Sequence, residues 1–159
     1  MSATFSFTVN GRPVTVADEG GDKLIHVLRG ALGLTGVHFG CGAEACGACL
    51  VLLDGEPVQS CTLPLERAAG RSVTTPEGIG TQNVPHPLQE AFIAEQAGQC
   101  GYCLSGILIA AKALLERNTD PTREEIALAL EKNLCRCGAH NRIVRAVQRA
   151  ARALRGESP

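Results

Sequence analysis

Eight cysteines dominate the chemistry that this 159-residue chain could perform. The first four lie in the first half, as Cys41, Cys46, Cys49 and, after eleven intervening residues, Cys61. Thiolates are soft ligands, so such a group can bind iron or zinc. The spacing C-x4-C-x2-C with a more distant fourth cysteine is typical of a [2Fe-2S] cluster held by a tight loop. Small residues within the run suit such a loop, because they let backbone N–H groups approach the cluster; they are Gly42, Gly47 and Ala48.

The other four cysteines occupy two short runs in the second half, Cys100-Gly101-Tyr102-Cys103 and Cys135-Arg136-Cys137. A set of four thiolates also satisfies tetrahedral zinc. Zinc ribbons usually pair C-x2-C with another C-x2-C, whereas C-x-C leaves only one residue between its two thiolates. An iron–sulfur cluster is therefore favoured over zinc here too. Disulfides are a third possibility, but a chain of this length does not need them to fold. We therefore predict two iron–sulfur clusters.

The composition limits the other roles. At 45% hydrophobic and 19% charged residues, the chain can bury a real core. Few aromatic residues, no Trp and a formal net charge of −1 argue against nucleic acid as a partner. No run approaches the roughly 20 apolar residues of a membrane span, and the first residues lack the order of a secretory signal. We expect a cytoplasmic protein without a membrane span, with any membrane association or export coming through partner subunits.

The first half reads as strands around one helix. Residues 5–9 and 13–16 alternate apolar and polar side chains across an Asn-Gly turn, which predicts a β-hairpin. Residues 24–32 have helical spacing, and we expect Asp22 to cap this helix and Gly33 to end it. Residues 50–58 form a second hairpin around Asp54-Gly55, leading to Cys61, and a short strand follows at 72–75. Together they predict a ferredoxin-like β-grasp domain over residues 1–76.

Residues 77–86 are rich in Gly, Pro, Thr and Asn, and we interpret them as a linker. Beyond it, residues 87–159 have helical periodicity throughout and predict a four-helix bundle, which makes the chain α+β. A capping box from Thr122 to Glu125 opens a helix that we expect to reach Leu134, and Asn141 is expected to cap the last helix. The cysteine pairs precede the second and fourth helices, whose N-termini direct partial positive charge toward them.

With these residues in place, the chain resembles the small iron–sulfur subunit of the molybdenum hydroxylases, the xanthine dehydrogenase and aldehyde oxidoreductase family. The resemblance covers essentially the whole chain. At Leu104-Ser105 the sequence departs from a common Thr-Pro, and is more similar to subunits serving N-heterocycle dehydrogenases, such as those acting on nicotinate or isoquinoline. We expect Ser105 to cap the following helix. The motifs that carry the resemblance include Gly40-Cys41-Gly42, Cys46-Gly47-Ala48-Cys49, Ser60-Cys61, His86-Pro87-Leu88-Gln89, Gln99-Cys100-Gly101-Tyr102-Cys103 and Asn133-Leu134-Cys135-Arg136-Cys137-Gly138.

The resemblance implies an oxidoreductase complex in which this chain is not catalytic alone. A large partner subunit would carry molybdenum and molybdopterin cytosine dinucleotide, contacted by Gln99 and Cys137, and would hydroxylate an N-heterocycle or an aldehyde. Electrons would leave one at a time to an FAD subunit, a cytochrome c or a quinone. By the same resemblance one cluster is bound by Cys41, Cys46, Cys49 and Cys61, and the other by Cys100, Cys103, Cys135 and Cys137.

Two other roles stay open, a free-standing ferredoxin-like electron carrier and a zinc-stabilised interaction module. Individual residues carry open alternatives as well. His140 could be a ligand as in Rieske centres, although a surface histidine is favoured. His38 could tune a cluster by hydrogen bonding, and Tyr102 could shield one from water. The arginines near the C-terminus are expected to form the solvated face of a helix, with docking on an acidic partner as the alternative.

Overall fold

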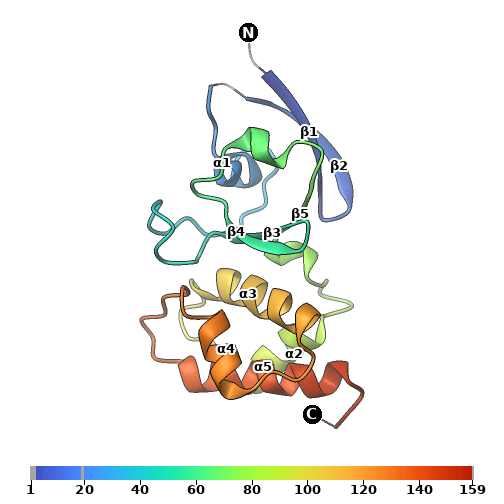
Figure 1. The fold of residues 1–159 in the computed structure, drawn as a ribbon, viewed down its shortest axis with the longest axis vertical. Coiled ribbons are helices and arrows are strands. Elements are labelled where there is room, and N and C mark those ends of the chain that lie inside the picture. Colours follow the sequence, from blue (N-terminus) through green and yellow to red (C-terminus); the bar gives the residue numbers. More distant parts are fainter. Residues whose placement is uncertain (1–2, 19, 159) are drawn as a thin grey trace.

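A sheet of five strands stands above a group of four helices in a computed structural model that describes residues 3–18 and 20–158 (Figure 1). The sheet begins with the hairpin of β1 (Ala3–Val9) and β2 (Arg12–Asp18), in which Phe7 lies opposite Val14. Asn10 and Gly11 form the turn with φ values of 50° and 77°. Positive φ at both positions is the requirement of the tight hairpin turn that the Asn-Gly pair predicted.

The other strands are β3 (Leu50–Leu53), β4 (Glu56–Gln59) and β5 (Ser72–Thr74). The order across the sheet is β2-β1-β5-β3-β4, with β1 and β5 parallel and the other pairs antiparallel. The predicted second hairpin and the short fifth strand are thus confirmed. Short 3₁₀ turns, η1 (Leu65–Ala68) and η2 (Pro76–Gly78), flank β5.

The one helix of the sheet domain, α1 (Leu24–Arg29), is shorter than its periodicity predicted. Its N-cap is Lys23 rather than Asp22, and no side chain caps it. Gly30 ends the helix, not Gly33. The reason is a turn of the backbone over the helix end, where the N–H groups of Leu32 and Leu34 donate to carbonyls of Val27 and Leu28 at 3.0 and 2.8 Å.

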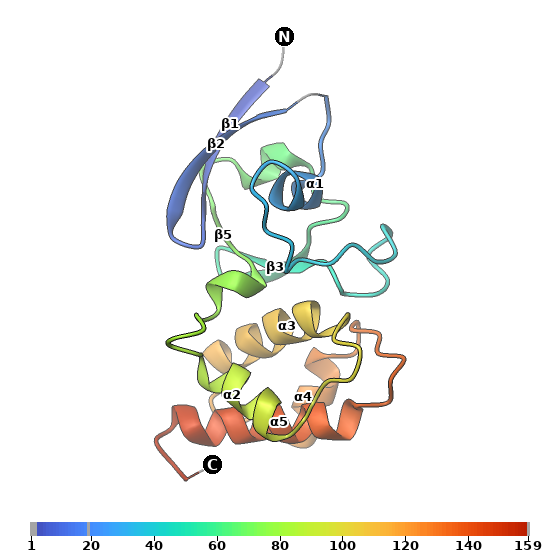
Figure 2. The same ribbon diagram turned by 180° about the vertical axis from the view of Figure 1, so that it is seen from behind.

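The helical half contains α2 (Pro87–Ala94), α3 (Leu104–Arg117), α4 (Arg123–Ala129) and α5 (His140–Leu154). Seen from behind, α3 lies between the sheet and the other helices (Figure 2). The predicted capping box is present, because Thr122 accepts from the N–H of Glu125 and Glu125 accepts from the N–H of Thr122. The α+β fold and the four-helix arrangement are therefore confirmed.

Two helix limits in this half differ from the sequence prediction. Helix α4 ends at Ala129, so Leu134 lies beyond it and is exposed. The cause is a long-range contact, since the N–H of Leu134 donates to the carbonyl of Cys46 at 3.0 Å. Helix α5 begins one residue before Asn141, with Ala139 as N-cap and no side-chain cap bond. The Asn141 side chain instead accepts from Arg123 at 2.6 Å.

A second capping box, which sequence reasoning missed, starts α2. The ring Nδ1 of His86 accepts from the N–H of Leu88 at 3.1 Å, while the side chain of Gln89 accepts from the N–H of His86 at 2.9 Å. Histidine is outside the usual group of N-cap residues, Ser, Thr, Asp and Asn. These two hydrogen bonds explain why His86 and Gln89 stand three residues apart in the run His86-Pro87-Leu88-Gln89.

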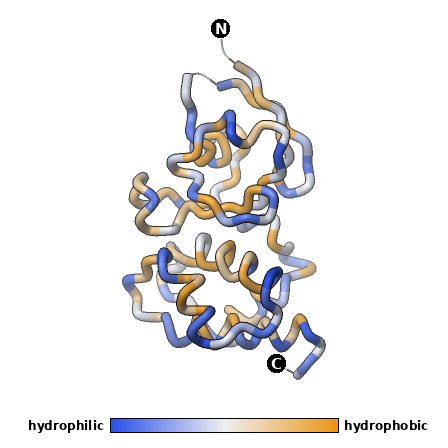
Figure 3. Tube along the Cα trace, in the orientation of Figure 1, coloured by the Kyte–Doolittle hydropathy of each residue, from blue (hydrophilic) through white to orange (hydrophobic). Residues whose placement is uncertain are grey.

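Strand β3 is buried on both faces. Val51 and Leu53 belong to the core between the sheet and α1. Leu50 and Leu52 face the other way and pack in a second cluster that includes Ile109 of α3. Double burial explains why this strand is a continuous apolar run rather than an alternation. Figure 3 shows hydrophobic residues on β3 and α3 where the two elements face each other. The sheet and the helices therefore share an apolar interface.

No helix in residues 3–18 and 20–158 is long and apolar enough to cross a membrane.

Candidate iron–sulfur sites

The first three cysteines lie in the loop between α1 and β3, which is wrapped around their sulfur atoms. The N–H groups of Ala43 and Ala45 donate to the Sγ of Cys41 at 3.3 and 3.2 Å, and the N–H of Cys41 donates to the Sγ of Cys46 at 3.3 Å. These backbone hydrogen bonds, first that of Ala43 and then that of Ala45, lower the pKa of Cys41 to about 7. The thiolate is the form that ligates a metal, so the loop favours the ligating state.

Glycine is required at two places where this loop meets sulfur or aromatic atoms. A Cβ on Gly40 would lie 2.6 Å from the Sγ of Cys46, which is closer than real contacts allow. Gly42 has a φ of 68°, in the left-handed region, and its added Cβ would lie 3.1 Å from the ring of Phe39. The predicted need for small residues in the loop has this steric basis.

Cys49 and Cys61 are brought together by the β3–β4 hairpin, at its two open ends. The hydroxyl of Ser60 donates to the carbonyl of Cys49 at 2.7 Å and fixes this end of the hairpin. Both thiols are buried, at 1% and 6% exposure. Burial raises the pKa of Cys49 to about 12. A bound cation reverses that preference, since a coordinating thiol is deprotonated by the metal charge.

The second set is gathered at the N-terminal ends of two long helices. Cys103 is the N-cap residue of α3, and Cys135 and Cys137 come just before α5. The sulfur atoms of Cys100 and Cys137 lie 3.5 Å apart. The N–H of Tyr102 lowers the pKa of Cys100, while burial raises that of Cys103 to about 12.

Each set offers four thiols. In the first set Cys41 and Cys46 lie in one loop, while Cys49 and Cys61 lie at the open ends of the β3–β4 hairpin. In the second set Cys100 and Cys137 come from separate runs, and their Sγ atoms approach to 3.5 Å. Four thiolates, two for each iron, are the donors that a [2Fe-2S] cluster requires. The chemistry of both donor sets therefore fits such clusters.

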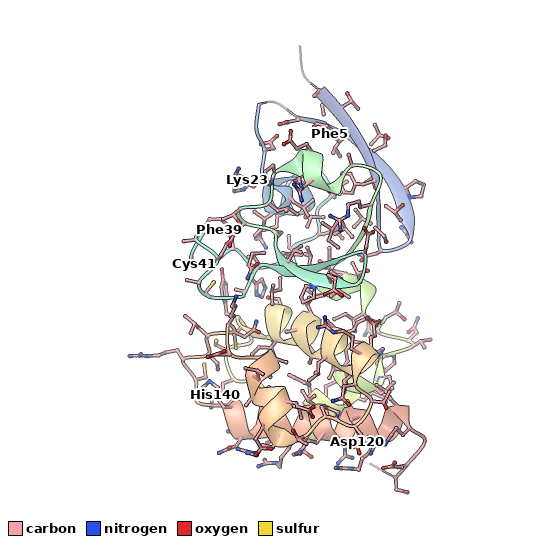
Figure 4. All side chains as sticks on the ribbon, in the orientation of Figure 1. Phe5, Lys23, Phe39, Cys41, Asp120 and His140 are labelled. Carbon is pink, nitrogen blue, oxygen red and sulfur yellow. The ribbon has the colours of Figure 1, made fainter. Side chains whose placement is uncertain are left out.

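Both sets border one cleft of about 250 Å³. Its lining includes Cys41 and Cys46 from the sheet domain and Cys100, Cys103 and Cys137 from the helical domain. Figure 4 shows Phe39 and Cys41 on the same flank of the molecule as His140, which opens α5. The fold thus brings two cysteine sets far apart in sequence to one region.

The tip of the first loop is inserted into the helical domain. Ser105 is buried, and its hydroxyl donates to the carbonyl of Ala48 at 2.8 Å rather than capping α3 as predicted. A Cβ on Gly106 would lie 1.8 Å from the carbonyl oxygen of Gly47. The Gly106 that ends the Cys103-Leu104-Ser105-Gly106 run therefore provides room for the other domain's loop.

The remaining predicted residues have the following surroundings. The side-chain amide of Gln99 donates to the carbonyl of Cys137 at 2.9 Å, and Gln99 is exposed. His140 is exposed as the first residue of α5. Tyr102 is half exposed and stacks on His38, and its shielding of a cluster stays a prediction. Gln99 and Cys137 are thus adjacent, whereas their pterin contact stays a prediction.

The arginines of α5 contact the helical domain itself. Arg145 and Arg149 pair with Glu95 at 3.0 and 3.6 Å, and Arg155 pairs with Asp120 at 2.9 Å. The guanidinium of Arg142 donates to the carbonyl of Gln96 at 3.2 Å. These contacts support the expectation of an outer helix face, because Arg145, Arg149 and Arg155 pair with acidic residues of the same chain.

A sheet domain and a helical domain that each carry four thiols, with both sets bordering one cleft, define a protein with two [2Fe-2S] clusters. Comparison with family models agrees, since a 2Fe-2S iron-sulfur cluster binding domain matches residues 7–75 and a [2Fe-2S] binding domain matches residues 75–148. The cofactor prediction of two [2Fe-2S] clusters is thereby confirmed.

Curated relatives match along nearly their whole length. A nicotinate dehydrogenase subunit from Pseudomonas putida is 51% identical over 155 residues, covering 98% of this chain and 99% of that protein. The alpha subunit of isoquinoline 1-oxidoreductase from Brevundimonas diminuta is 48% identical over 147 residues, covering 92% and 96%. The chain belongs to the family of small iron–sulfur subunits of the molybdenum hydroxylases, the xanthine dehydrogenase family.

Solved structures share the fold. Quinoline 2-oxidoreductase from Pseudomonas putida 86 matches with a TM-score of 0.91 and 36% identity, covering 98% of both chains. Aldehyde oxidoreductase from Desulfovibrio desulfuricans matches with a TM-score of 0.93 and 45% identity, covering 97% of this chain. This chain spans only 17% of that longer chain. The two-domain unit therefore occurs both as a separate chain and as part of a larger one.

Proposed function

We propose that this chain is the electron-transfer subunit of a molybdenum hydroxylase complex. Bound to the protein, each [2Fe-2S] cluster supplies a one-electron carrier. The observation that carries the proposal is the single cleft that both cysteine sets border. The proposed ligands are Cys41, Cys46, Cys49 and Cys61 for one cluster and Cys100, Cys103, Cys135 and Cys137 for the other.

The helical domain is proposed to face a large partner subunit that carries molybdopterin cytosine dinucleotide. Gln99 and Cys137 support this orientation because Gln99 is exposed and Cys137 is only partly buried, and the Gln99 amide donates to the Cys137 carbonyl at 2.9 Å. A glutamine amide has two N–H donors and an acceptor oxygen, so one bond to Cys137 leaves groups able to bind a pterin.

The sheet domain is proposed to face the external acceptor, either an FAD subunit or a cytochrome c. Support comes from exposure, because Cys41 and Glu44 are both at the surface while Cys49 and Cys61 are buried. A chain that passes electrons between two partners needs one accessible edge at each end. In this proposal the sheet domain comprises residues 1–76, the linker residues 77–86 and the helical domain residues 87–159.

The substrate of the complex is proposed to be an N-heterocycle, with an aldehyde as the second candidate. Support comes from the relatives, which are described as subunits of nicotinate dehydrogenase and isoquinoline 1-oxidoreductase. A cytoplasmic location is also proposed. All eight cysteines are free of disulfides, as a reducing compartment requires.

The test is purification of the chain from its native host under mild conditions. Mass spectrometry identifies the co-purifying subunits, and metal and flavin or haem assays follow. A molybdenum-bearing large subunit, with iron at about four per copy of this chain, is expected. Recovery of the chain alone with its iron, after controls for dissociation, would contradict the proposal and favour a free-standing carrier. A colourless protein containing zinc would contradict it too.

A further inference from the structure

Tyr102 connects the two cysteine sets. It stands between Cys100 and Cys103, yet every contact of its ring, hydroxyl and carbonyl that the structure records is made to the sheet domain. Its carbonyl accepts from the Nδ1 of His38 at 2.7 Å, and its ring stacks on the His38 ring with centroids 4.6 Å apart and planes at 20°. Its hydroxyl donates to the carbonyl of Phe39.

These contacts hold the start of the first cysteine loop, His38 and Phe39, which we call its front edge. These two residues come immediately before Gly40 and Cys41. The rear of the loop is held separately, by the carbonyls of Cys46 and Ala48, which accept from Leu134 and Ser105. Cys41 itself is hydrogen-bonded only within its own loop, to Ala43, Ala45 and Cys46.

The start of the first loop, which leads into Cys41, is therefore held against the second set by Tyr102. Cys41 and Cys100 are both exposed and both line the shared cleft. If the front edge swung outward, Cys41 would move from Cys100 while the buried Cys49 and Cys61 stayed in the hairpin. The hydroxyl and the stacked ring each oppose that movement.

We propose that Tyr102 is a positioning residue that fixes the separation of the two cluster loops and thereby sets the rate of electron transfer between them. The inference rests on the proposed function. In the transfer step one electron leaves the centre on the helical domain, which is oxidised, and the centre on the sheet domain accepts it and is reduced. No bond is made or broken, so the rate depends on how the protein holds the two loops.

The experiment uses the purified complex with the variants Tyr102→Phe and Tyr102→Leu. Tyr102→Phe removes the hydroxyl bond and keeps the stack, whereas Tyr102→Leu removes both. Two readouts are taken: the spin–spin splitting in the electron paramagnetic resonance spectrum of the fully reduced complex, and the rate constant of electron equilibration after rapid partial reduction. Tyr102→Phe loses one hydrogen bond, so we expect a weaker splitting and a smaller rate constant than in the wild type. Tyr102→Leu also loses the ring pair, so both decreases should be larger than in Tyr102→Phe.

His38 and His140 provide a matched pair of controls, since each is three residues from a predicted ligand, Cys41 or Cys137. His38→Ala is expected to weaken the splitting and slow the transfer. His140→Ala is expected to change neither, because exposed His140 has no recorded bond to the sheet domain. All variants must retain iron content and the individual cluster signals.

Unchanged splitting and rate in Tyr102→Leu, with both clusters intact, would overturn the inference and leave Tyr102 as surface packing. A changed melting temperature with unchanged splitting would overturn it as well. Failure of the proposed function gives a different result, namely no molybdenum subunit in the preparation. The splitting is then measured on the dithionite-reduced chain, which tests Tyr102 without reference to substrate.

Discussion

The side-chain amide of Asn133 donates a hydrogen bond to the carbonyl oxygen of Gly47 at 3.3 Å, across 86 positions of sequence. Asn133 stands two residues before Cys135, and Gly47 stands between Cys46 and Cys49, so this bond joins the two cysteine loops directly. A Cβ on Gly47 would lie 2.6 Å from the Asn133 amide nitrogen. The two loops therefore meet so closely at Gly47 that no side chain fits there.

Replacing Gly106 by Ala tests this close packing. The added Cβ would lie 1.8 Å from the carbonyl oxygen of Gly47, so the domains must separate locally. We expect a loss of at least about 1–3 kcal/mol in the free energy of unfolding, the usual cost of overpacking, measured by thermal or urea denaturation. Gly70→Ala is the control, because its φ of 70° is strained for alanine although its Cβ would meet nothing. A loss in Gly106→Ala no larger than in Gly70→Ala would contradict the steric explanation.

Ser105→Ala removes the bond from the Ser105 hydroxyl to Ala48. Because Ser105 is buried, the carbonyl of Ala48 loses a partner that water cannot readily replace. The expected loss is about 1–3 kcal/mol of unfolding free energy, determined from denaturation curves. Ser6→Ala is the matched control, since the Ser6 hydroxyl bonds Thr15 at an exposed site and its loss should cost much less. Equal effects of the two substitutions would show that burial at Ser105 is unimportant.

The separate ligand sets predict separate spectroscopic effects. Cys46→Ser should lose or alter one electron paramagnetic resonance signal, and Cys103→Ser should lose or alter the other, because each removes a thiolate from one set only. Iron should fall from about four to about two atoms per chain if the altered cluster is lost. Ser6→Ala, at an exposed site on the hairpin of β1 and β2, serves as a control that should retain both signals. If either cysteine variant abolished both signals, two independent sites would be ruled out.

His86 makes the stability of the helical domain depend on pH. Burial, followed by the charge of Lys112, lowers the pKa of His86 below its ordinary value of 6.5, and only the neutral ring can accept from the N–H of Leu88. The unfolded chain therefore takes up the proton first. The stability from this cap is present above pH 6.5 and is lost as the pH falls from 6.5 through the lower folded pKa.

His86→Asn supplies an acceptor that does not titrate, so it should reduce the loss of stability between about pH 7 and pH 5. The measurement is the free energy of unfolding by urea across this range. His140→Asn, at an exposed residue that caps no helix by its side chain, should leave the wild-type pH dependence in place. An unaltered pH dependence in His86→Asn would refute a titrating cap.

What the sequence could predict was mostly local. The Asn10-Gly11 turn and the Thr122 capping box each depend on contacts within a few residues, and both are present. The spacing of Cys41, Cys46 and Cys49 is local in the same sense, because one loop groups these three thiols. The assignment of individual ligands and of the Gln99 contact stays a prediction.

What the sequence could not predict depends on the other domain. Ser105 looked like a helix cap because its partner Ala48 is 57 positions away. The end of α4 could not be read from periodicity, since the bond between Leu134 and Cys46 removes that segment from the helix. The contact of Tyr102 with His38 could not be read from the sequence either, because the two residues are 64 positions apart. A distinct signal existed only for β3, whose uninterrupted apolar residues are typical of a strand covered on both sides.

The double burial of β3 also affects the order in which the protein can be made. Its outer residues, Leu50 and Leu52, are covered by Ile109 and its neighbours on α3, which leave the ribosome more than fifty residues later. Until then the newly made sheet presents an uncovered apolar side to the cell, beside a set of unoccupied thiols. An exposed apolar surface of this kind is prone to aggregation until α3 covers it. The second set of thiols is complete only later still, when Cys137 has been made.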